Sequence, residues 1–268
     1  MDPEALNMLA QSLRTAMTAA SGAKLDAVLS DLGWHDMLDE LPDVAIPLVF
    51  RLLGETGAHA PVLNDVVLRE AGAAPGGTLA LPFAGGCWVV WERGEGVGSA
   101  IDEALPIHRV PQGDLLPRAA VDAGRRALGW WMVGAGRAML ALARQHALDR
   151  VQFGRRISSF QAIRHRLAET LVAIEGAEAT LHVAADSDDH DGLASLLAKA
   201  AAGQAALTAA RHCQQVLGGI GFTAEHALHH HVKRSLTLDG LLGNTRDLTR
   251  EAGKALVDRG FAPRLAEL

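Results

Sequence analysis

Residues 150–161 read RVQFGRRISSFQ and join two long segments that are rich in alanine and leucine. Apolar residues recur at helical spacing on both sides of this connector and in the chain that follows it. The spacing predicts five helical segments in this half of the chain: 119–148, 159–185, 191–217, 224–238 and 245–259. Long antiparallel helices with short connectors are typical of a bundle, so we expect four or five of these helices to pack together.

The chain before this half divides into two further regions. Helical periodicity runs through 4–30 and 44–71, and glycine and proline then punctuate the sequence up to residue 117. Short runs at Thr78–Leu81 and Cys87–Trp91 are candidate strands. The sequence therefore predicts a mainly α fold with three parts: an N-terminal helical domain (1–75), a reduced β insert (76–117) and a C-terminal helical bundle (118–268).

Composition excludes several classes of function. Apolar residues make up 49% of the chain, which indicates a globular protein with a substantial core, and the net charge of −6 gives no reason to expect nucleic acid as a partner. No apolar run approaches the roughly 20 residues of a membrane span, and the N-terminus lacks the pattern of a signal peptide. Cys87 and Cys213 lack metal-ligand spacing, so we expect reduced thiols in a cytoplasmic protein that does not bind a membrane.

The connector 150–161 contains more than a turn requires. Gly154 suits a helix C-cap, and Ser158 with Gln161 fits a capping box at the start of the next helix. Those three residues leave Arg150 and Gln152 unexplained, together with two further arginines. Arginines beside a helix N-terminus favour the binding of phosphate.

A second connector, QQVLGGIGFTAEH at 214–226, has three glycines where one would serve. A C-cap and a tight turn, with Thr223 as the next N-cap, explain part of this pattern. The alternative is that Gly218, Gly219 and Gly221 let a flat or phosphorylated ligand approach the backbone closely. Because both connectors follow helices of the same predicted bundle, together they favour a binding site.

The histidines of HALHHHVKR are a weaker candidate. His226, His229 and His230 have spacing that places them on one helix face, where a metal site is conceivable. No Asp, Glu or Cys ligand occurs at matching spacing, so we expect surface or subunit-contact histidines and no metal.

Two segments resemble the acyl-CoA dehydrogenase family. RVQFGRRISSFQAIRHRLAET resembles the family's Arg-x-Gln-Phe-Gly turn and the helix after it, and QQVLGGIGFTAEHALHHHVKRSL resembles its Gln-x-x-Gly-Gly-x-Gly-aromatic segment. Their order and spacing also match, so the resemblance covers 119–259. More loosely, LGWHDMLDELPDVAIPLVFRLLGETGAHAPVLNDVVL resembles the family's N-terminal helical domain. The resemblance implies an acyl-CoA dehydrogenase-like fold and an FAD at a subunit interface.

The resemblance also implies which residues reach that FAD. Arg150 would pair with the pyrophosphate, Gln152 and Phe153 would line the cofactor, and Gln215 and the glycine backbone would contact its ADP portion. Thr245 matches a threonine that the family retains beside its catalytic base. The implied cofactor-binding residues are Arg150, Gln152, Phe153, Gln215, Gly218, Gly219 and Thr245.

The family's catalytic base is missing from its usual position. The reaction removes a proton next to a thioester, which requires a positioned carboxylate, and in most members a glutamate supplies it. In LDGLLGNTRDL at 238–248, Gly243 falls on that position. Some relatives place the glutamate earlier, at or near Gly124 here. Asp122 is two residues away and would point about 200° off on a helix. A stand-alone enzyme that uses Asp122 or Asp239 as its base is a further alternative.

The β insert is too short for the family's β-domain, so the chain retains the edge that reaches FAD but lacks most of the substrate side. This asymmetry resembles one subunit of the bacterial heteromeric acyl-CoA dehydrogenases, flavoprotein oxidoreductases linked to lipid or steroid catabolism. The resemblance implies an α2β2 heterotetramer in which an α-like partner holds the base and shares the FAD with this non-catalytic β-like chain. The alternative is a cofactor-free helical scaffold or regulatory subunit of the same fold.

Overall fold

The computed structural model describes residues 3–94, 96, 98–186 and 192–261. The fold is mainly α, as the sequence predicts, and five helices form its N-terminal part: α1 (Pro3–Ala19), α2 (Ala23–Asp31), α3 (Trp34–Glu40), α4 (Pro42–Thr56) and α5 (Val62–Glu70). Proline at the start of α4 suits the first helical turn, and Gly57 ends that helix in the left-handed conformation with φ 74°.

A small antiparallel sheet follows the N-terminal helices. Its strands β1 (Ala80–Phe83), β2 (Cys87–Trp91) and β3 (Ile107–Val110) lie in sequence order. The predicted second strand is confirmed residue for residue, and the first begins two residues later than predicted. The sheet meets the turn after α9 through an antiparallel bridge between Phe83 and Leu241, so the insert lies against the bundle.

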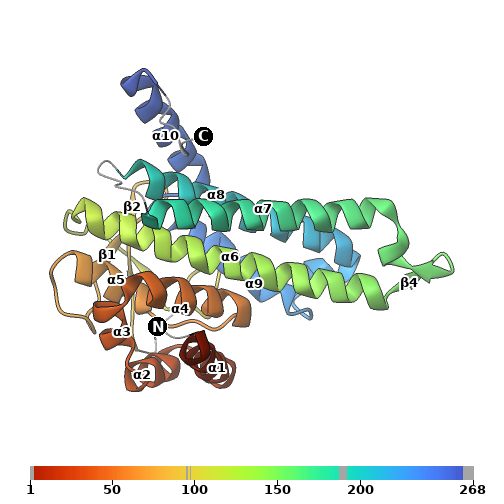
Figure 1. Ribbon diagram of the computed structural model, residues 1–268, viewed down its shortest axis with the longest axis horizontal. Helices are drawn as coiled ribbons and strands as arrows, with labels where there is room; N and C mark the ends of the chain where they lie inside the picture. The colour runs from red at the N-terminus through yellow and green to blue at the C-terminus, as the bar shows by residue number, and fades with distance from the viewer. Residues whose placement is uncertain (1–2, 95, 97, 187–191, 262–268) are drawn as a thin grey trace.

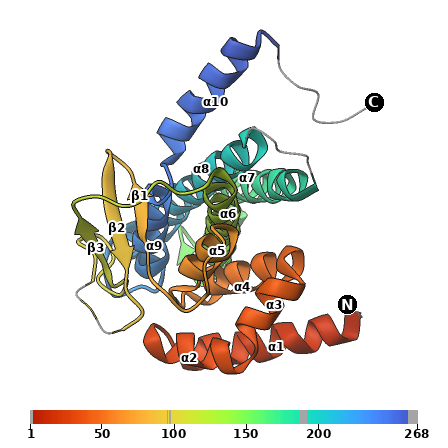
Figure 2. The same ribbon diagram turned by 90° about the vertical axis from the view of Figure 1, so that its left-hand side faces the viewer.

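Long helices build the C-terminal part: α6 (Arg118–Asp149), α7 (Gln161–Asp186), α8 (Leu193–Leu217), α9 (Leu228–Gly240) and α10 (Thr245–Arg259). These five match the predicted segments closely. α6, α7, α8 and α9 pack as a bundle, and α10 leaves the body at the end opposite the β4 hairpin (Figures 1 and 2).

One core connects all three regions. Trp131 of α6 is fully buried, stacks on Trp91 of β2 at a centroid distance of 5.6 Å and meets Phe50 of α4 edge-on at 5.7 Å. Aromatic pairs at such distances add stability beyond the apolar area that they bury. The division into 1–75, 76–117 and 118–268 stays a prediction, because side chains from all three regions meet in this cluster.

The closest helix packing in the core depends on two glycines. A Cβ on Gly54 of α4 would lie 2.2 Å from the carbonyl oxygen of Trp131, and one on Gly134 of α6 would lie 2.1 Å from that of Arg51. The backbones of α4 and α6 therefore approach so closely that a side chain at either position would clash with the other helix.

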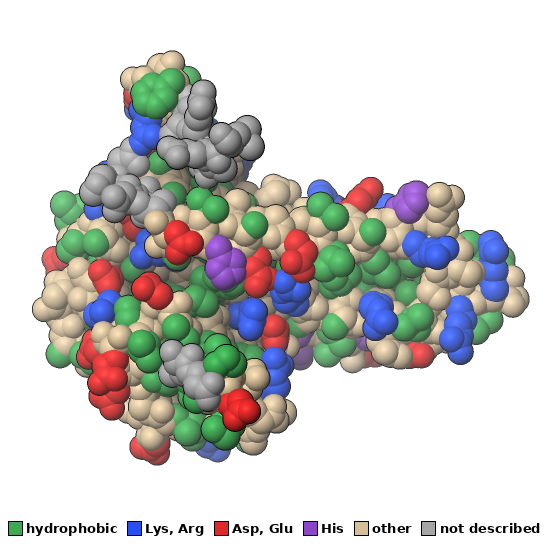
Figure 3. Space-filling view, viewed as in Figure 1, with side chains coloured by type: hydrophobic (Ala, Val, Ile, Leu, Met, Phe, Trp, Pro, Cys, Tyr) green, Lys and Arg blue, Asp and Glu red, His purple; other side chains and the backbone are tan. Residues whose placement is uncertain are grey.

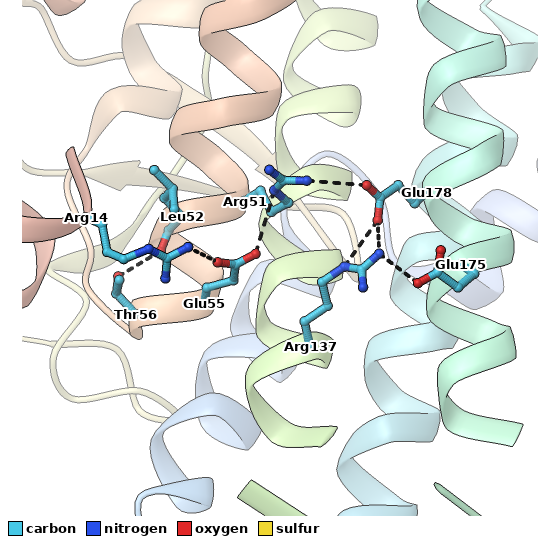
Figure 4. A network of polar contacts seen from close by, with 8 residues as sticks. All are labelled: Arg14, Arg51, Leu52, Glu55, Thr56, Arg137, Glu175 and Glu178. Atoms are coloured by element: carbon cyan, nitrogen blue, oxygen red, sulfur yellow. Dashed lines mark hydrogen bonds and ion pairs between the residues drawn. The ribbon is translucent and has the colours of Figure 1, made fainter. Parts of the chain in front are cut away.

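A chain of charged side chains ties the N-terminal helices to the bundle (Figure 4). Cations and carboxylates alternate in it: Arg14, Glu55, Arg51, Glu178, Arg137 and Glu175. Arg51 of α4 bridges Glu55 at 3.7 Å and Glu178 of α7 at 3.5 Å. Exposed ion pairs contribute about 0–1 kcal/mol each, so this network orients the helices more than it stabilises them.

The segment Leu193–Phe222 contains a window with a mean hydropathy of 1.2, which by length and composition meets the test for a membrane span. The sequence analysis found no such run. Sixty-seven per cent of that window is buried inside the protein, as in the central helix of a globular core.

Candidate functional site

The connector 150–161 forms a β-hairpin that extends from the end of the bundle (Figure 1). Strand β4 (Val151–Gln152) pairs with β5 (Arg155–Arg156), and Phe153 and Gly154 form the two-residue turn with φ 52° and 74°. Two successive positive φ angles are typical of the type I′ turn, whose twist matches that of the strands. Gly154 therefore serves a hairpin turn, and the predicted helix C-cap is wrong.

The predicted capping box does not form. A short 3-10 turn, Ile157–Ser159, precedes α7, and Gln161 is the first residue of that helix, where its side chain cannot reach back to a cap. Instead the Ser159 hydroxyl donates to the Arg156 carbonyl at 2.7 Å, and the Gln161 amide lies 3.3 Å from the His165 ring.

The hairpin presents its side chains to solvent in a fixed arrangement. Phe153 is 91% exposed and meets Phe160 edge-on at 6.2 Å, and the Arg155 guanidinium lies 4.2 Å from the centre of the Phe160 ring. Arg150 and Gln152 are also exposed. Phe153 also adopts a positive φ, which carries a conformational cost for a residue other than glycine.

The glycine-rich connector forms a 3-10 turn, Gly218–Phe222. Gly218 caps α8 with φ 67° and donates its N–H to the Gln214 carbonyl, as the plain interpretation expected. A Cβ on Gly221 would clash with that carbonyl, but Cβ atoms on Gly218 and Gly219 would meet nothing within 4 Å among the described residues. The backbone at these two glycines is therefore open to a ligand, and Gln215 is exposed beside them.

Thr223 was expected to be the N-cap of the next helix, and this prediction is wrong. Its hydroxyl donates to the Ile220 carbonyl at 3.0 Å, within the preceding turn. At the start of α9, Nδ1 of His226 accepts the Leu228 N–H at 3.1 Å.

Both connectors rest on the same core. A separate apolar cluster at this end of the bundle joins α6, α8 and α9, and its fully buried members include Met139, Ala143, Cys213 and Leu228. Ile157 packs against it from the hairpin side. Burial raises the pKa of the free thiol of Cys213 to about 12.

The pKa of His146, on α6, is affected by charged residues of both connectors. Its pKa is lowered, first by burial and then by the positive charges of His226 and Arg150. Positive charge gathers more widely here, since several Lys and Arg side chains lie on the bundle end that bears the hairpin (Figure 3). Arg150, Arg155, Arg156 and Arg164, from the hairpin and the start of α7, are all exposed. This end is basic although the chain as a whole is acidic.

Thr245 is not brought together with the other predicted residues. It begins α10, at the end of α9 away from the hairpin, and is largely buried (Figure 1). Its N–H and hydroxyl donate to the Asp239 carboxylate at 3.0 and 2.5 Å. Both groups, including the carboxylate considered as a base, are therefore engaged in holding the turn between α9 and α10.

Lys199 is a buried cation beside the Gly243 turn that the sequence analysis missed. Its ammonium is fully buried in α8 and donates to the carbonyls of Asp239 and Gly243. Burial lowers its pKa to about 7. The available signal was a lone lysine within an alanine- and leucine-rich helix, LASLLAKAAAG.

The alternative base, Asp122, is held by cations. Its carboxylate lies 3.7 Å from both Arg118 and Arg125, and the residue is 6% exposed. At Gly124, where some relatives were expected to carry the glutamate, a Cβ would lie 2.5 Å from Leu242. The position is therefore packed against the 239–243 turn.

The histidines of the 226–231 segment do not converge. His229 and His230 meet edge-on at 5.8 Å, whereas His231 is buried. Among the described residues, no group of three His, Cys, Asp or Glu side chains is placed to hold a metal ion.

The fold is a helical bundle with a small antiparallel sheet. Its connectors form an exposed arginine hairpin and a glycine-rich turn. The model of the acyl-CoA dehydrogenase C-terminal domain matches residues 112–255, more than half of the chain. The chain therefore belongs to the acyl-CoA dehydrogenase family.

Individual relatives agree with this assignment. Acyl-CoA dehydrogenase FadE34 of Mycobacterium tuberculosis is 34% identical over 75% of this chain, which spans only 30% of that relative's length. The ChsE4–ChsE5 complex of M. tuberculosis superposes with a TM-score of 0.73 at 18% identity, covering 98% of this chain and 99% of that one. A Tcur3481–Tcur3483 steroid ACAD variant gives 0.71 at 19%, covering 96% and 99%. At these identities the two structures establish the fold alone.

Proposed function

We propose that this chain is a non-catalytic subunit of a heteromeric, FAD-dependent acyl-CoA dehydrogenase. Its partner would supply the catalytic base, and this chain would complete the FAD site with Arg150, Gln152, Phe153, Gln215, Gly218 and Gly219. The observation that carries the proposal is a contrast between the two ends of the bundle. The basic end keeps exposed, preorganised groups, whereas the turn at the other end has Gly243 in place of a carboxylate.

The residues of the basic end fit the ADP half of an FAD. A guanidinium such as Arg150 pairs with pyrophosphate, and open glycine backbone admits a flat or phosphorylated group. Bound FAD would supply the hydride acceptor, while the residues of this chain would bind and orient the cofactor. Thr245 remains a proposed contact, although its hydroxyl is engaged with Asp239.

The partner and substrate follow from the relatives. One structural neighbour is a complex of two differently named chains, and another is a steroid ACAD, so we propose an α-like partner in an α2β2 assembly that acts on a steroid-derived acyl-CoA. We also propose a cytoplasmic location. A cofactor-free scaffold of the same fold is the competing proposal, and it predicts a colourless complex.

The test is FAD retention by the complex with its partner. Arg150→Ala should weaken FAD binding about tenfold or more, because a desolvated phosphate loses a charge-assisted hydrogen bond. Flavin absorbance per complex after gel filtration measures the effect. Arg250→Ala removes an exposed arginine on α10 and should leave the flavin content unchanged. Full flavin occupancy in the Arg150 variant, or a colourless wild-type complex, would refute the assignment.

A further inference from the structure

Helix α7 is apolar on two opposite sides. It packs against α6 and α8 and lies on the outside of the bundle (Figure 2). Its buried residues, which include Ile174 and Leu181, form the inner side. On the outer side Val172 is 71% exposed and Val183 is 42% exposed. A helix that is apolar all round is typical of a helix that is buried all round, so the outer side of α7 calls for a partner.

The exposed apolar residues follow helical spacing and form one continuous face. At about 100° per residue they fall within about 40° on either side of the direction of Val172. This set, which we name the α7 outer face, consists of Ala168, Val172, Gly176, Ala179 and Val183, all exposed. The face therefore alternates two larger side chains with three small residues.

The α7 outer face contains a groove of a size that receives a side chain. Four of the residues that line it have the spacing i, i+3, i+4, i+7 of a coiled-coil hole: His165, Ala168, Glu169 and Val172. In a pair of antiparallel α7 helices, Val183 of one copy enters this hole in the other copy.

A second hole gives the same register. Its members have the same spacing and are Gly176, Ala179, Thr180 and Val183. When Val183 enters the first hole, Val172 of the same antiparallel pair enters the second one. Both insertions place the two-fold axis beside Gly176. The face is therefore complementary to itself, which an isologous contact between two identical chains requires.

Charges at the two ends of α7 favour the antiparallel direction. Arg164 and His165 lie near its first residue, Asp186 is its last, and all three are exposed. None of the three has an ion-pair partner among the described residues. In the antiparallel pair, Arg164 of one copy lies opposite Asp186 of the other, whereas a parallel pair would place arginine beside arginine. Glu175, which flanks the face near the axis, is already paired with Arg137 at 2.9 Å.

We propose that the α7 outer face binds the same face of a second copy of this chain, antiparallel about a two-fold axis beside Gly176. The contact uses neither connector, so it is separate from the proposed FAD site. In the proposed α2β2 assembly it joins the two β-like chains.

The mass of the full-length chain in solution, without its partner, tests the contact. We expect sedimentation to give twice the mass of one chain for the wild type. Val172→Glu should weaken the dimer about a hundredfold or more, because the two-fold axis brings two unpaired carboxylates into the contact. Val257→Glu is the matched control, since it makes the same change at a valine of α10 that is 77% exposed, and it should leave the mass unchanged.

A cysteine near the axis tests the register. The background is Cys87→Ser, because the other native cysteine, Cys213, is buried. A Cβ at position 176 would meet nothing within 4 Å among the described residues. Gly176→Cys should form a disulfide between two copies under mild oxidation, because the axis brings the two Cβ atoms within the roughly 4 Å that the bond needs. Gly253→Cys on α10 is equally open and should form none.

Three results would overturn the proposal. The first is a monomeric wild-type chain, and the second is equal mass for the Val172→Glu variant and the wild type. The third is a Gly176→Cys chain that forms no disulfide with its own copy, or that forms one only with the partner chain in the complex. None of these measurements depends on flavin. A colourless complex would therefore refute the proposed FAD site and leave this contact standing.

Discussion

Gly243 has a backbone conformation that a glutamate adopts only at a cost. Its φ is 101°, and a Cβ there would lie 2.7 Å from Cδ2 of Leu248. Two side chains also hold this turn. The Lys199 ammonium donates to the Gly243 carbonyl, and the Arg125 guanidinium donates to the Leu242 carbonyl at 3.1 Å. The position that we propose to match the family's base is therefore adapted here to a glycine.

Gly243→Glu is accordingly expected to reduce stability without creating an enzyme. The positive φ should cost about 1–3 kcal/mol in the free energy of unfolding, measured by urea denaturation. The variant expressed without a partner should show no acyl-CoA oxidation with an artificial electron acceptor. Measurable turnover by this variant alone would contradict the non-catalytic assignment.

At the scale of residues, the sequence was a poor guide to local geometry, and the residues that it selected for cofactor binding stay predictions. Arg150 and Gln152 were selected because no turn needs them, and both are exposed at the end of the bundle. The capping roles of Gly154 and Thr223 were wrong, because glycine and threonine suit several turns whose choice depends on the chain that follows. Lys199 was missed because its partners are backbone carbonyls 40 and 44 residues away.

Among the elements, the crossing of α4 and α6 is the most demanding contact. Each of Gly54 and Gly134 faces the backbone of the other helix, which cannot move aside as a side chain can. The sequence shows two glycines inside helical patterns, where glycine costs about 1 kcal/mol relative to alanine, but it does not show that they face each other.

Gly54→Ala is expected to lower the free energy of unfolding by about 3 kcal/mol, because overpacking forces the two helices apart. Gly176→Ala on α7 is the matched control. A Cβ there would meet nothing within 4 Å among the described residues, so the variant should be unchanged or more stable by up to about 1 kcal/mol. Thermal and urea denaturation measure both, and equal stability of the two variants would disprove the close crossing.

For the molecule as a whole, a buried ion pair joins regions that are distant in sequence. Arg234 of α9 pairs with Asp102 from the segment between β2 and β3 at 2.5 Å, and donates to the Ala58 carbonyl after α4 at 3.1 Å. Two histidines flank this pair. Burial first, and then the charge of Arg234, lower the pKa values of His59 and His231 to about 4; Asp102 opposes the shift at His59, and His230 adds to it at His231.

Stability should therefore fall as the pH falls below about 6.5. The unfolded chain binds protons on these histidines near pH 6.5, whereas the folded protein resists until about pH 4, so each costs up to about 1.4 kcal/mol per pH unit in that window. Urea denaturation between pH 7.5 and about 5, above the carboxylate range, measures it. His231→Gln should flatten the slope and the exposed control His165→Gln should not; a flat wild-type profile would contradict the prediction.

The sequence by itself determined the helices of the bundle, two of the three strands of the small sheet and the family, because apolar periodicity and turn residues act locally and leave a direct pattern. Only the tertiary structure decided how the connectors fold, that one tryptophan core unites the three regions, and that Lys199 and Arg125 secure the turn at Gly243. These features depend on contacts between residues far apart in the chain. Their free energy comes from burial and from pairing of backbone polar groups, which a linear pattern does not record.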